Sequence, residues 1–148
     1  MKRFVWRLQR VLEIKKKEEQ KERSELLELT EELAEKRGEL LIRRKMLEDI
    51  IDDLAGENPK NRLGGQEFFL RHAGTSDQKI KEIKDKISNL ELQQKEKIAV
   101  VLKIRRFNDG LEKLRVEAKR QFIEEQEKLE QKELDEGARI AFVRKTLS

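Results

Sequence analysis

Residues that interrupt a helix are concentrated in one stretch of this chain, Gly56 to Ser76. This stretch holds four of the seven glycines and the only proline, Pro59. Glycine admits positive φ angles and proline lacks an amide donor, so both disfavour a helix interior. Outside this stretch the chain is almost free of such residues. The chain is therefore expected to form two helical arms that are joined by one connector and packed antiparallel.

Composition excludes several other architectures. Charged residues make up 45% of the 148 residues and aromatic residues 5%, which leaves too little apolar material for a layered globular core. Disorder is the competing interpretation of so polar a chain. The absence of cysteine excludes disulfides and thiolate metal sites. The apolar runs are too short to span a membrane. The basic start, MKRFVWRLQR, is interrupted by charges and is interpreted as part of the mature protein.

A heptad repeat favours the coiled coil over disorder. With Val5 at position a, one frame carries the leucines of the first arm, as a left-handed two-helix seam requires. Its a positions are Val5, Leu12, Glu19, Leu26, Leu33, Leu40, Leu47 and Leu54. Its d positions are Leu8, Lys15, Glu22, Leu29, Lys36, Arg43 and Ile50.

The second arm continues in one frame that starts with Ile80 at position a. Its core positions are Ile80, Ile83, Ile87, Leu90, Gln94, Lys97, Val101, Ile104, Asn108, Leu111, Arg115, Ala118, Phe122, Glu125 and Leu129. Ile98, Phe107 and Leu114 lie beside these positions and widen the apolar stripe. A capping box is expected at the start of this arm, with Thr75 as N-cap and Gln78 at N3.

The predicted fold is all-α, a two-stranded antiparallel coiled-coil helical hairpin that forms a single domain over residues 1–148. The first arm is expected over about residues 4–55, the connector over 56–75 and the second arm over about 76–136. A C-terminal extension covers 137–148.

Two features predict the register of the arms. A polar gap interrupts the first seam between Lys15 and Glu25, and Asn108, Asp109 and Gly110 weaken the second. Pairing residues whose numbers sum to about 132 places these weak segments opposite each other. Residues 1–17 hold seven Lys or Arg and one Glu, whereas residues 124–136 hold seven Asp or Glu and two Lys. These blocks are expected to lie side by side, although surface ion pairs are individually weak.

No constellation of catalytic or ligand-binding residues stands out. His72 is alone, and Gly64-Gly65 lacks the Lys-Ser or Lys-Thr pair of a phosphate loop. The many carboxylates fall at spacings that pair with Lys and Arg on exposed helix faces. The sequence predicts no catalytic, cofactor-binding or metal-binding residue, no cofactor, and no enzymatic activity.

Two apolar clusters exceed what the seam needs. The terminal cluster combines aromatic, aliphatic and arginine side chains and is predicted to bind a partner; the alternative is that the two chain ends pack on each other. Its residues are Phe4, Trp6, Arg7, Arg10, Val11, Ile14, Ile140 and Phe142. The second cluster contains Phe68 and Phe69 in the connector. It either caps the hairpin end or forms an exposed docking tip.

The terminal residues resemble the flagellar export protein FliJ family. That family tends to begin with an aromatic residue, then Leu-Gln, Val-Leu, a lysine and a glutamate, followed near the end by a Glu–Lys–Leu–Asp–Glu signature. The matching residues are Phe4, Leu8, Gln9, Val11, Leu12, Lys15 and Glu18, then Glu130, Lys132, Leu134, Asp135 and Glu136. Chain length and the two-arm layout also match.

This resemblance implies a stalk similar to the central stalk of rotary ATPases, without catalytic activity of its own. Its joined termini would enter the pore of a hexameric export ATPase, and it would also contact the export gate protein and export chaperones. The expected location is cytoplasmic, at the inner-membrane face of the flagellar base, through association with a membrane complex. Alternatives are an injectisome stalk protein, or a generic coiled-coil scaffold or chaperone. A nucleic-acid-binding arm is not expected, because the basic block lacks periodic aromatic residues.

Overall fold

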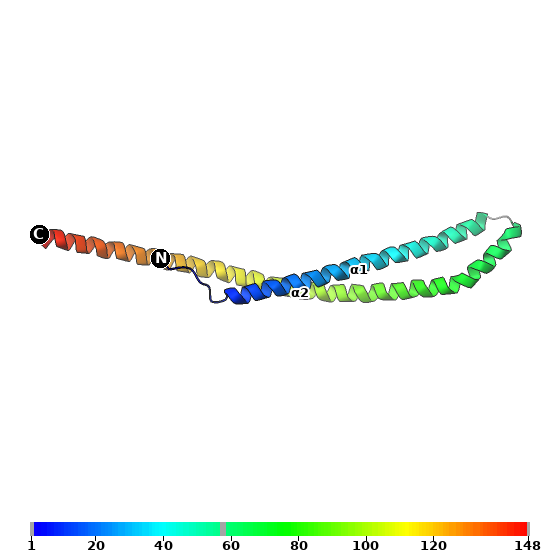
Figure 1. The fold of residues 1–148 in the computed structure, drawn as a ribbon, viewed down its shortest axis with the longest axis horizontal. Helices are drawn as coiled ribbons and strands as arrows, with labels where there is room; N and C mark the ends of the chain where they lie inside the picture. Colours follow the sequence, from blue (N-terminus) through cyan, green and yellow to red (C-terminus); the bar gives the residue numbers. More distant parts are fainter. Residues whose placement is uncertain (1, 57–58, 148) are drawn as a thin grey trace. The chain divides into compact units, whose positions relative to one another are not determined.

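The computed structural model describes residues 2–56 and 59–147, and for residues 59–62 it describes the backbone alone. Nearly all of the described chain is helical (Figure 1). Helix α1 spans Gln9–Gly56, 48 residues, and α2 spans Pro59–Leu147, 89 residues. The two helices pack against each other with opposite directions and no strand occurs in the described residues. The predicted antiparallel helical hairpin is therefore confirmed.

The helix boundaries differ from the expected ones at three places. Helix α1 begins at Gln9 instead of near Phe4, and residues 2–6 have no regular structure. Helix α2 begins at Pro59 instead of Ser76. Proline suits the first turn of a helix, because its missing amide hydrogen has no intrahelical acceptor there. The same helix runs to Leu147, so the expected C-terminal extension is helical too. Residues 1, 57, 58 and 148 lie outside the described part of the chain.

Contacts divide the described residues into two units, and both helices contribute to each. The turn-side unit is Gln20–Leu102, and the terminal unit consists of the described residues up to Glu19 and from Lys103 onward. In the turn-side unit Leu33, Ile83, Ile87 and Leu90 form a buried cluster, against which Leu29 and Leu40 pack. In the terminal unit the buried residues are Leu12, Asn108 and Leu111.

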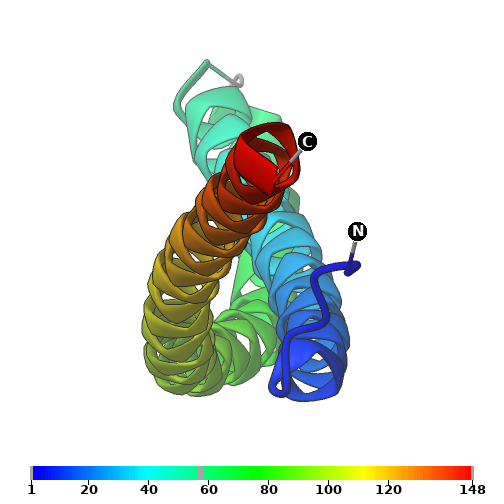
Figure 2. The same ribbon diagram turned by 90° about the vertical axis from the view of Figure 1, so that its left-hand side faces the viewer.

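Burial follows the heptad frame over most of its length. Every predicted a and d position of the first arm is buried or half-buried except Val5, which is 82% exposed. The same holds in the second arm up to Phe122, whereas Glu125 and Leu129 are exposed. The seam ends there because α1 begins only at Gln9 and leaves the later part of α2 without a helical partner. Figure 1 shows this part of α2, in orange and red, continuing past the first residues of the chain, and Figure 2 shows the same part from its C-terminal end.

The register differs from the predicted one. The Asn108 amide nitrogen donates a hydrogen bond to the Lys15 carbonyl oxygen at 3.2 Å, so residues whose numbers sum to 123 share a layer. Asn108 thus meets the predicted polar gap at its start, Lys15, whereas Lys97 meets Glu22. The predicted pairing near 132 is wrong because α2 begins at Pro59, so that the turn uses fewer residues than the glycine-rich stretch contains. None of the described helices is long and apolar enough to cross a membrane.

Candidate partner-binding site

The first residues of the chain lie along α2 within the terminal unit. The Phe4 and Phe122 rings are 5.4 Å apart between centroids and tilted by 51°. This geometry is favourable for an aromatic pair. Lys2 lines a shallow hollow together with Phe122, Ile123, Gln126, Glu127 and Glu130. The Gln9 amide donates to the Trp6 carbonyl oxygen at 3.1 Å, which turns the segment into α1. Phe4 is therefore held in place by α2.

The start of α1 presents a mixed apolar and basic surface. Trp6 is half-buried, whereas Arg7 and Arg10 are exposed. Val11 is 39% exposed and Ile14 is 55% exposed. The predicted off-seam position of these residues is consistent with their exposure. Val11 and Ile14 are aliphatic side chains that the hairpin itself leaves open to a partner.

Two residues that the sequence assigned to the widened stripe belong to this surface. Phe107 is 50% exposed and Leu114 is 56% exposed. Both occupy position g of the second frame, as Val11 does in the first, so all three flank the seam on the same side in an antiparallel pair. The Lys15 ammonium lies 5.6 Å from the centroid of the Phe107 ring, within cation–π range. The seven-residue spacing of Phe107 and Leu114 is the sequence feature from which their place on this surface could have been predicted.

The last part of α2 is exposed along its whole length. Every described residue from Glu127 to Leu147 is exposed, including Ile140 at 55% and Phe142 at 71%. The alternative in which the two apolar chain ends cover each other is therefore not found, because Phe4 packs on Phe122 instead. Another shallow hollow in this segment is lined by Glu130, Glu133, Leu134, Gly137 and Ala138.

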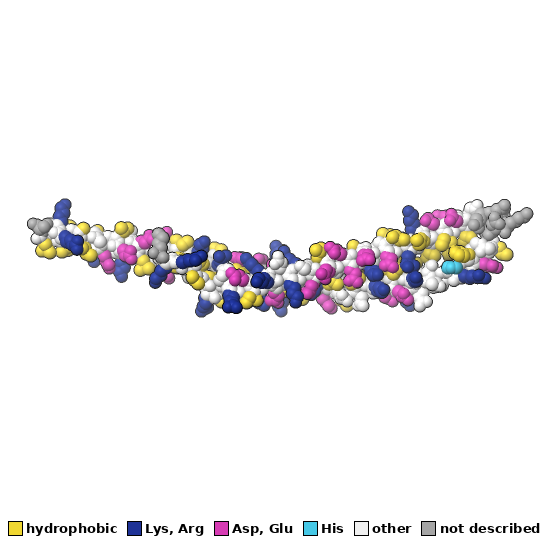
Figure 3. Space-filling view, in the orientation of Figure 1, with side chains coloured by type: hydrophobic (Ala, Val, Ile, Leu, Met, Phe, Trp, Pro, Cys, Tyr) yellow, Lys and Arg dark blue, Asp and Glu magenta, His cyan; other side chains and the backbone are white. Residues whose placement is uncertain are grey.

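The two charge blocks meet only at their edges. Lys2 lies beside the acidic segment of α2 in the hollow near Glu127. Other lysines of the basic block pair elsewhere: Lys15 with Glu18 at 3.1 Å, and Lys16 with Glu112 at 2.5 Å. The Lys16 hydrogen bond lowers the pKa of the Glu112 carboxyl below its ordinary value. Figure 3 shows Lys and Arg interspersed with Asp and Glu over the visible face.

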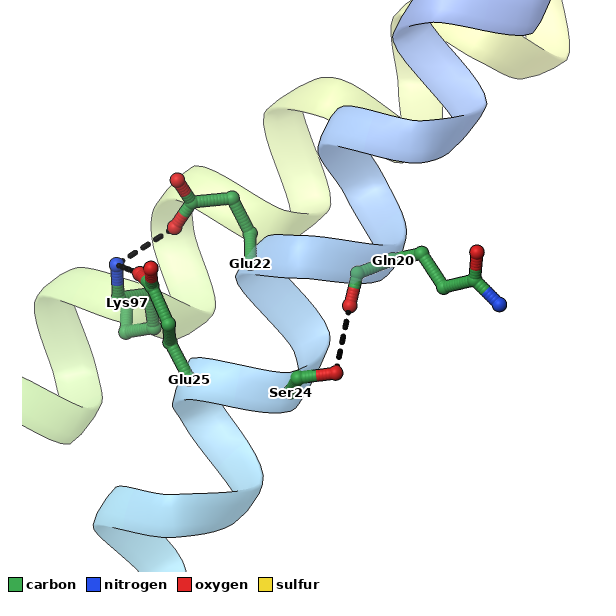
Figure 4. A network of polar contacts seen from close by, with 5 residues as sticks. All are labelled: Gln20, Glu22, Ser24, Glu25 and Lys97. Carbon is green, nitrogen blue, oxygen red and sulfur yellow. Dashed lines mark hydrogen bonds and ion pairs between the residues drawn. The ribbon is translucent and has the colours of Figure 1, made fainter.

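A polar cluster crosses the seam in the turn-side unit (Figure 4). The Lys97 ammonium lies 2.6 Å from a carboxylate oxygen of Glu22 and 2.6 Å from one of Glu25. The hydrogen bond from Lys97 lowers the pKa of Glu25, and the bonds to Glu22 and Glu25 raise the pKa of Lys97. Gln94 also crosses the seam and donates to the Thr30 hydroxyl at 3.1 Å. This cluster occupies the predicted polar gap and ties α1 to α2.

The predicted tip residues lie on α2 in different surroundings. Phe68 is 54% exposed, and its ring stacks on His72 with 4.2 Å between centroids. His72 Nδ1 is 2.9 Å from the Phe68 carbonyl oxygen. Phe69 is half-buried. His72 thus makes contacts within its own helix, and nothing about its surroundings indicates catalysis.

The described residues expose apolar and basic side chains, and no catalytic or metal-binding cluster is found among them. No group of three or more His, Cys, Asp or Glu residues in this part of the chain could hold a metal ion. The surface instead offers exposed aliphatic and aromatic side chains beside arginines, the residue types that often dominate binding energy at protein interfaces.

Comparison with protein families gives a match that covers nearly all of the sequence. A family model described as Flagellar FliJ protein matches residues 3–147, essentially the whole chain. No curated protein and no solved structure gives a significant match.

Proposed function

Because the chain belongs to the flagellar FliJ protein family, a non-catalytic component of flagellar type III protein export, we propose that its terminal segments bind the pore of the hexameric export ATPase. The observation that carries this proposal is the exposed end of α2. From Glu127 to Leu147 a helix with exposed Ile140 and Phe142 has no cover from the rest of the described chain. A ring-shaped partner that surrounds the helix would bury these side chains.

The start of α1 supplies the second half of the proposed contact. Exposed Arg7 and Arg10 lie beside exposed Val11 and Ile14 in the same unit as the end of α2. An apolar, partly acidic pore lining would pair with the arginines and bury the aliphatic groups. Phe4 and Trp6 support this surface, since Phe4 fixes the N-terminal segment on Phe122.

The remaining partners belong to the same proposal. The hairpin would link the ATPase to the export gate protein and receive export chaperones, from a position on the cytoplasmic face of the inner membrane at the flagellar base. The family match favours a flagellar system over an injectisome. Phe68 and Phe69 are proposed as a second contact surface, at which partly exposed aromatic rings are available.

Turnover of the export ATPase tests the terminal contact. The double change Ile140→Ala and Phe142→Ala removes exposed apolar groups and should leave helicity intact while reducing stimulation of ATP hydrolysis several-fold. The double change Leu92→Ala and Leu102→Ala is the matched control, because both of its side chains are also exposed apolar groups of α2 and lie outside the proposed contacts. Arg7→Ala with Arg10→Ala should weaken stimulation and reduce its dependence on salt. Full stimulation by the first variant and loss in the control would overturn the proposal.

A further inference from the structure

The tail of α2, defined here as residues Glu127–Leu147, extends a helix side that is partly covered nearer the seam. Lys2 lies against this side of α2, where it lines a hollow with Ile123 and Glu130. Each described residue from Glu133 to Leu147 is exposed. Figure 1 shows this end of α2, in red, running on past the other helix. The tail therefore offers an open helix surface to a further partner.

One continuous face of the tail is centred on Gly137. In an α-helix, residues three, four and seven positions before and after a given residue lie on the same side of the helix as that residue. We call the resulting set, together with Gly137, the tail face. Its other members are Glu130, Glu133, Leu134, Ile140, Ala141 and Arg144.

Gly137 permits a close approach at the centre of the tail face. It has no side chain, and a Cβ atom at this position would meet nothing within 4 Å. Gly137 and Leu134 both line a shallow hollow. Leu134 is 68% exposed on one side of Gly137, and Ile140 is 55% exposed on the other. A second helix that crosses the tail at Gly137 would bury both of these apolar side chains.

The charges of the tail are divided about Gly137. Residues 127–136 hold five Asp or Glu and two Lys, so their net formal charge is −3. Residues 138–147 hold three Lys or Arg and no acidic residue, so their net formal charge is +3. An antiparallel neighbour of the same sequence would place the basic half of one tail beside the acidic half of the other, whereas a parallel neighbour would place like charges together. The tail is therefore complementary to itself in the antiparallel direction.

An antiparallel pair of tails centred on Gly137 brings specific residues of the tail face together. Residues at equal distances from the centre face each other, so Glu130 of one copy faces Arg144 of the other. Leu134 likewise faces Ile140. Glu130 and Arg144 are both exposed, so each is available to a second copy. Each contact occurs twice, because the pair has two-fold symmetry.

We propose that two copies of this chain associate tail to tail, as an antiparallel pair of helices that cross at Gly137. The division of charge identifies the occupant of the tail face, since a second copy supplies the complementary pattern by symmetry. Because the same face is used on both copies, the contact closes on itself and gives a dimer instead of a fibre.

The dimer and the ATPase contact exclude each other, and this consequence rests on the function proposed above. Ile140 belongs to both contacts, so a tail that is paired with a second copy is not free to enter the ATPase pore. The dimer covers the tail while the protein is free, and binding to the ATPase draws the equilibrium back to the monomer.

Sedimentation equilibrium of the full-length protein alone tests the dimer. The average mass should rise from that of a monomer toward that of a dimer between micromolar and submillimolar concentration. Glu130→Lys and Arg144→Glu should each weaken the association about tenfold, because either reversal places like charges opposite each other twice. Asp135→Lys and Lys132→Glu are the matched controls, since both residues are exposed on the opposite side of the same helical segment. A monomer at every concentration overturns the proposal, as do controls that weaken the dimer equally.

Mixing Glu130→Lys protein with Arg144→Glu protein gives a sharper result. In the mixed dimer both facing pairs again join opposite charges, so the mixture should associate about as tightly as the unaltered protein. Misfolding of either variant could not produce this recovery. A mixture that associates as weakly as its two components overturns the proposed pairing.

Cysteine substitution tests the crossing point and the direction, because the chain has no cysteine of its own. Gly137→Cys should give a disulfide-linked dimer on oxidation, since this residue faces itself across the two-fold axis. Leu134→Cys should give little, because its two copies would lie about 9 Å apart along an antiparallel pair. A parallel pair would link both variants, so equal yields overturn the antiparallel arrangement.

The linked Gly137→Cys dimer also tests the exclusion of the ATPase. It should fail to stimulate ATP turnover until a reductant separates the two copies. Stimulation by the linked dimer overturns the exclusion and leaves the dimer itself standing. The sedimentation experiments contain no ATPase, so their failure overturns the dimer and leaves the proposed ATPase contact standing.

Discussion

At the residue scale, Lys97 joins α1 to α2 through two carboxylates. Lys97 lowers the pKa of Glu25 in the folded protein. This pair therefore stabilises the fold fully above the unfolded-state pKa of about 4.3. The stabilisation is lost as the pH falls through the lower folded-state pKa of Glu25. The raised pKa of Lys97 means that its contribution is present below the unfolded value of about 10.4 and is lost as pH rises through the folded value.

Replacing Lys97 by methionine should therefore lower the melting temperature most between about pH 5 and pH 10. The substitution keeps the apolar stem but leaves Glu22 and Glu25 facing each other. As the pH falls through the lowered pKa of Glu25, that carboxyl becomes protonated and the difference from the unaltered protein should shrink. Melts followed by circular dichroism from pH 3 to pH 9 measure this, with exposed Lys103→Met as the control. A pH-independent difference would contradict the ion-pair account.

Asn108 is the second residue whose chemistry sets the seam. It is 4% exposed, its amide nitrogen bonds the Lys15 carbonyl, and its Oδ1 atom is buried without a partner. Asn108→Leu should raise the stability by on the order of 1 kcal/mol, because it removes a buried acceptor that has no partner and adds buried apolar surface. Asn108→Ala should lower it by leaving a void. Chemical denaturation ranks the three proteins, and a leucine variant less stable than the alanine variant would refute this.

At the element scale, the sequence predicted the seam well and the helix ends poorly. The heptad frame places Leu12, Leu33 and Leu90 at core positions, and all three are buried. The glycine and proline residues led to a wrong prediction of where α2 begins. They were expected to exclude a helix, but each glycine costs only about 1 kcal/mol in a helix. The exposure of Phe107 and Leu114 was missed for a different reason. Whether a side chain at position g is buried or exposed depends on the register of the two helices. The heptad pattern alone does not determine that register.

The glycines near the start of α2 give a prediction for that element. Gly64 and Gly74 lie in the helix without positive φ, and a Cβ atom at either meets nothing within 4 Å. The double change Gly64→Ala and Gly74→Ala should therefore stabilise the protein by about 1–2 kcal/mol, with higher helicity. Unchanged helicity would show that these glycines are not helical in solution.

At the whole-molecule scale, the hairpin stability and the proposed partner contact reside in different parts of the chain. The seam positions are buried or half-buried from Leu8 to Phe122, whereas every described residue from Glu127 onward is exposed. Folding therefore requires the seam, and the last turns of α2 add helix length without adding buried apolar area. Stability and binding should accordingly respond to separate changes.

A chain that ends at Gln126 tests this separation. It should keep the midpoint of thermal unfolding, because the deleted residues bury no apolar side chain in the described structure. It should lose stimulation of the export ATPase, since it lacks Ile140 and Phe142.

Leu33→Ala is the opposite control. It removes a core side chain that is 1% exposed, and it should destabilise the protein by about 2 kcal/mol or more while leaving the terminal surface intact. At a temperature where Leu33→Ala remains folded, it should still stimulate the ATPase. A truncated chain that unfolds earlier would place part of the fold's stability beyond Gln126, and one that stimulates fully would move the contact to the start of α1.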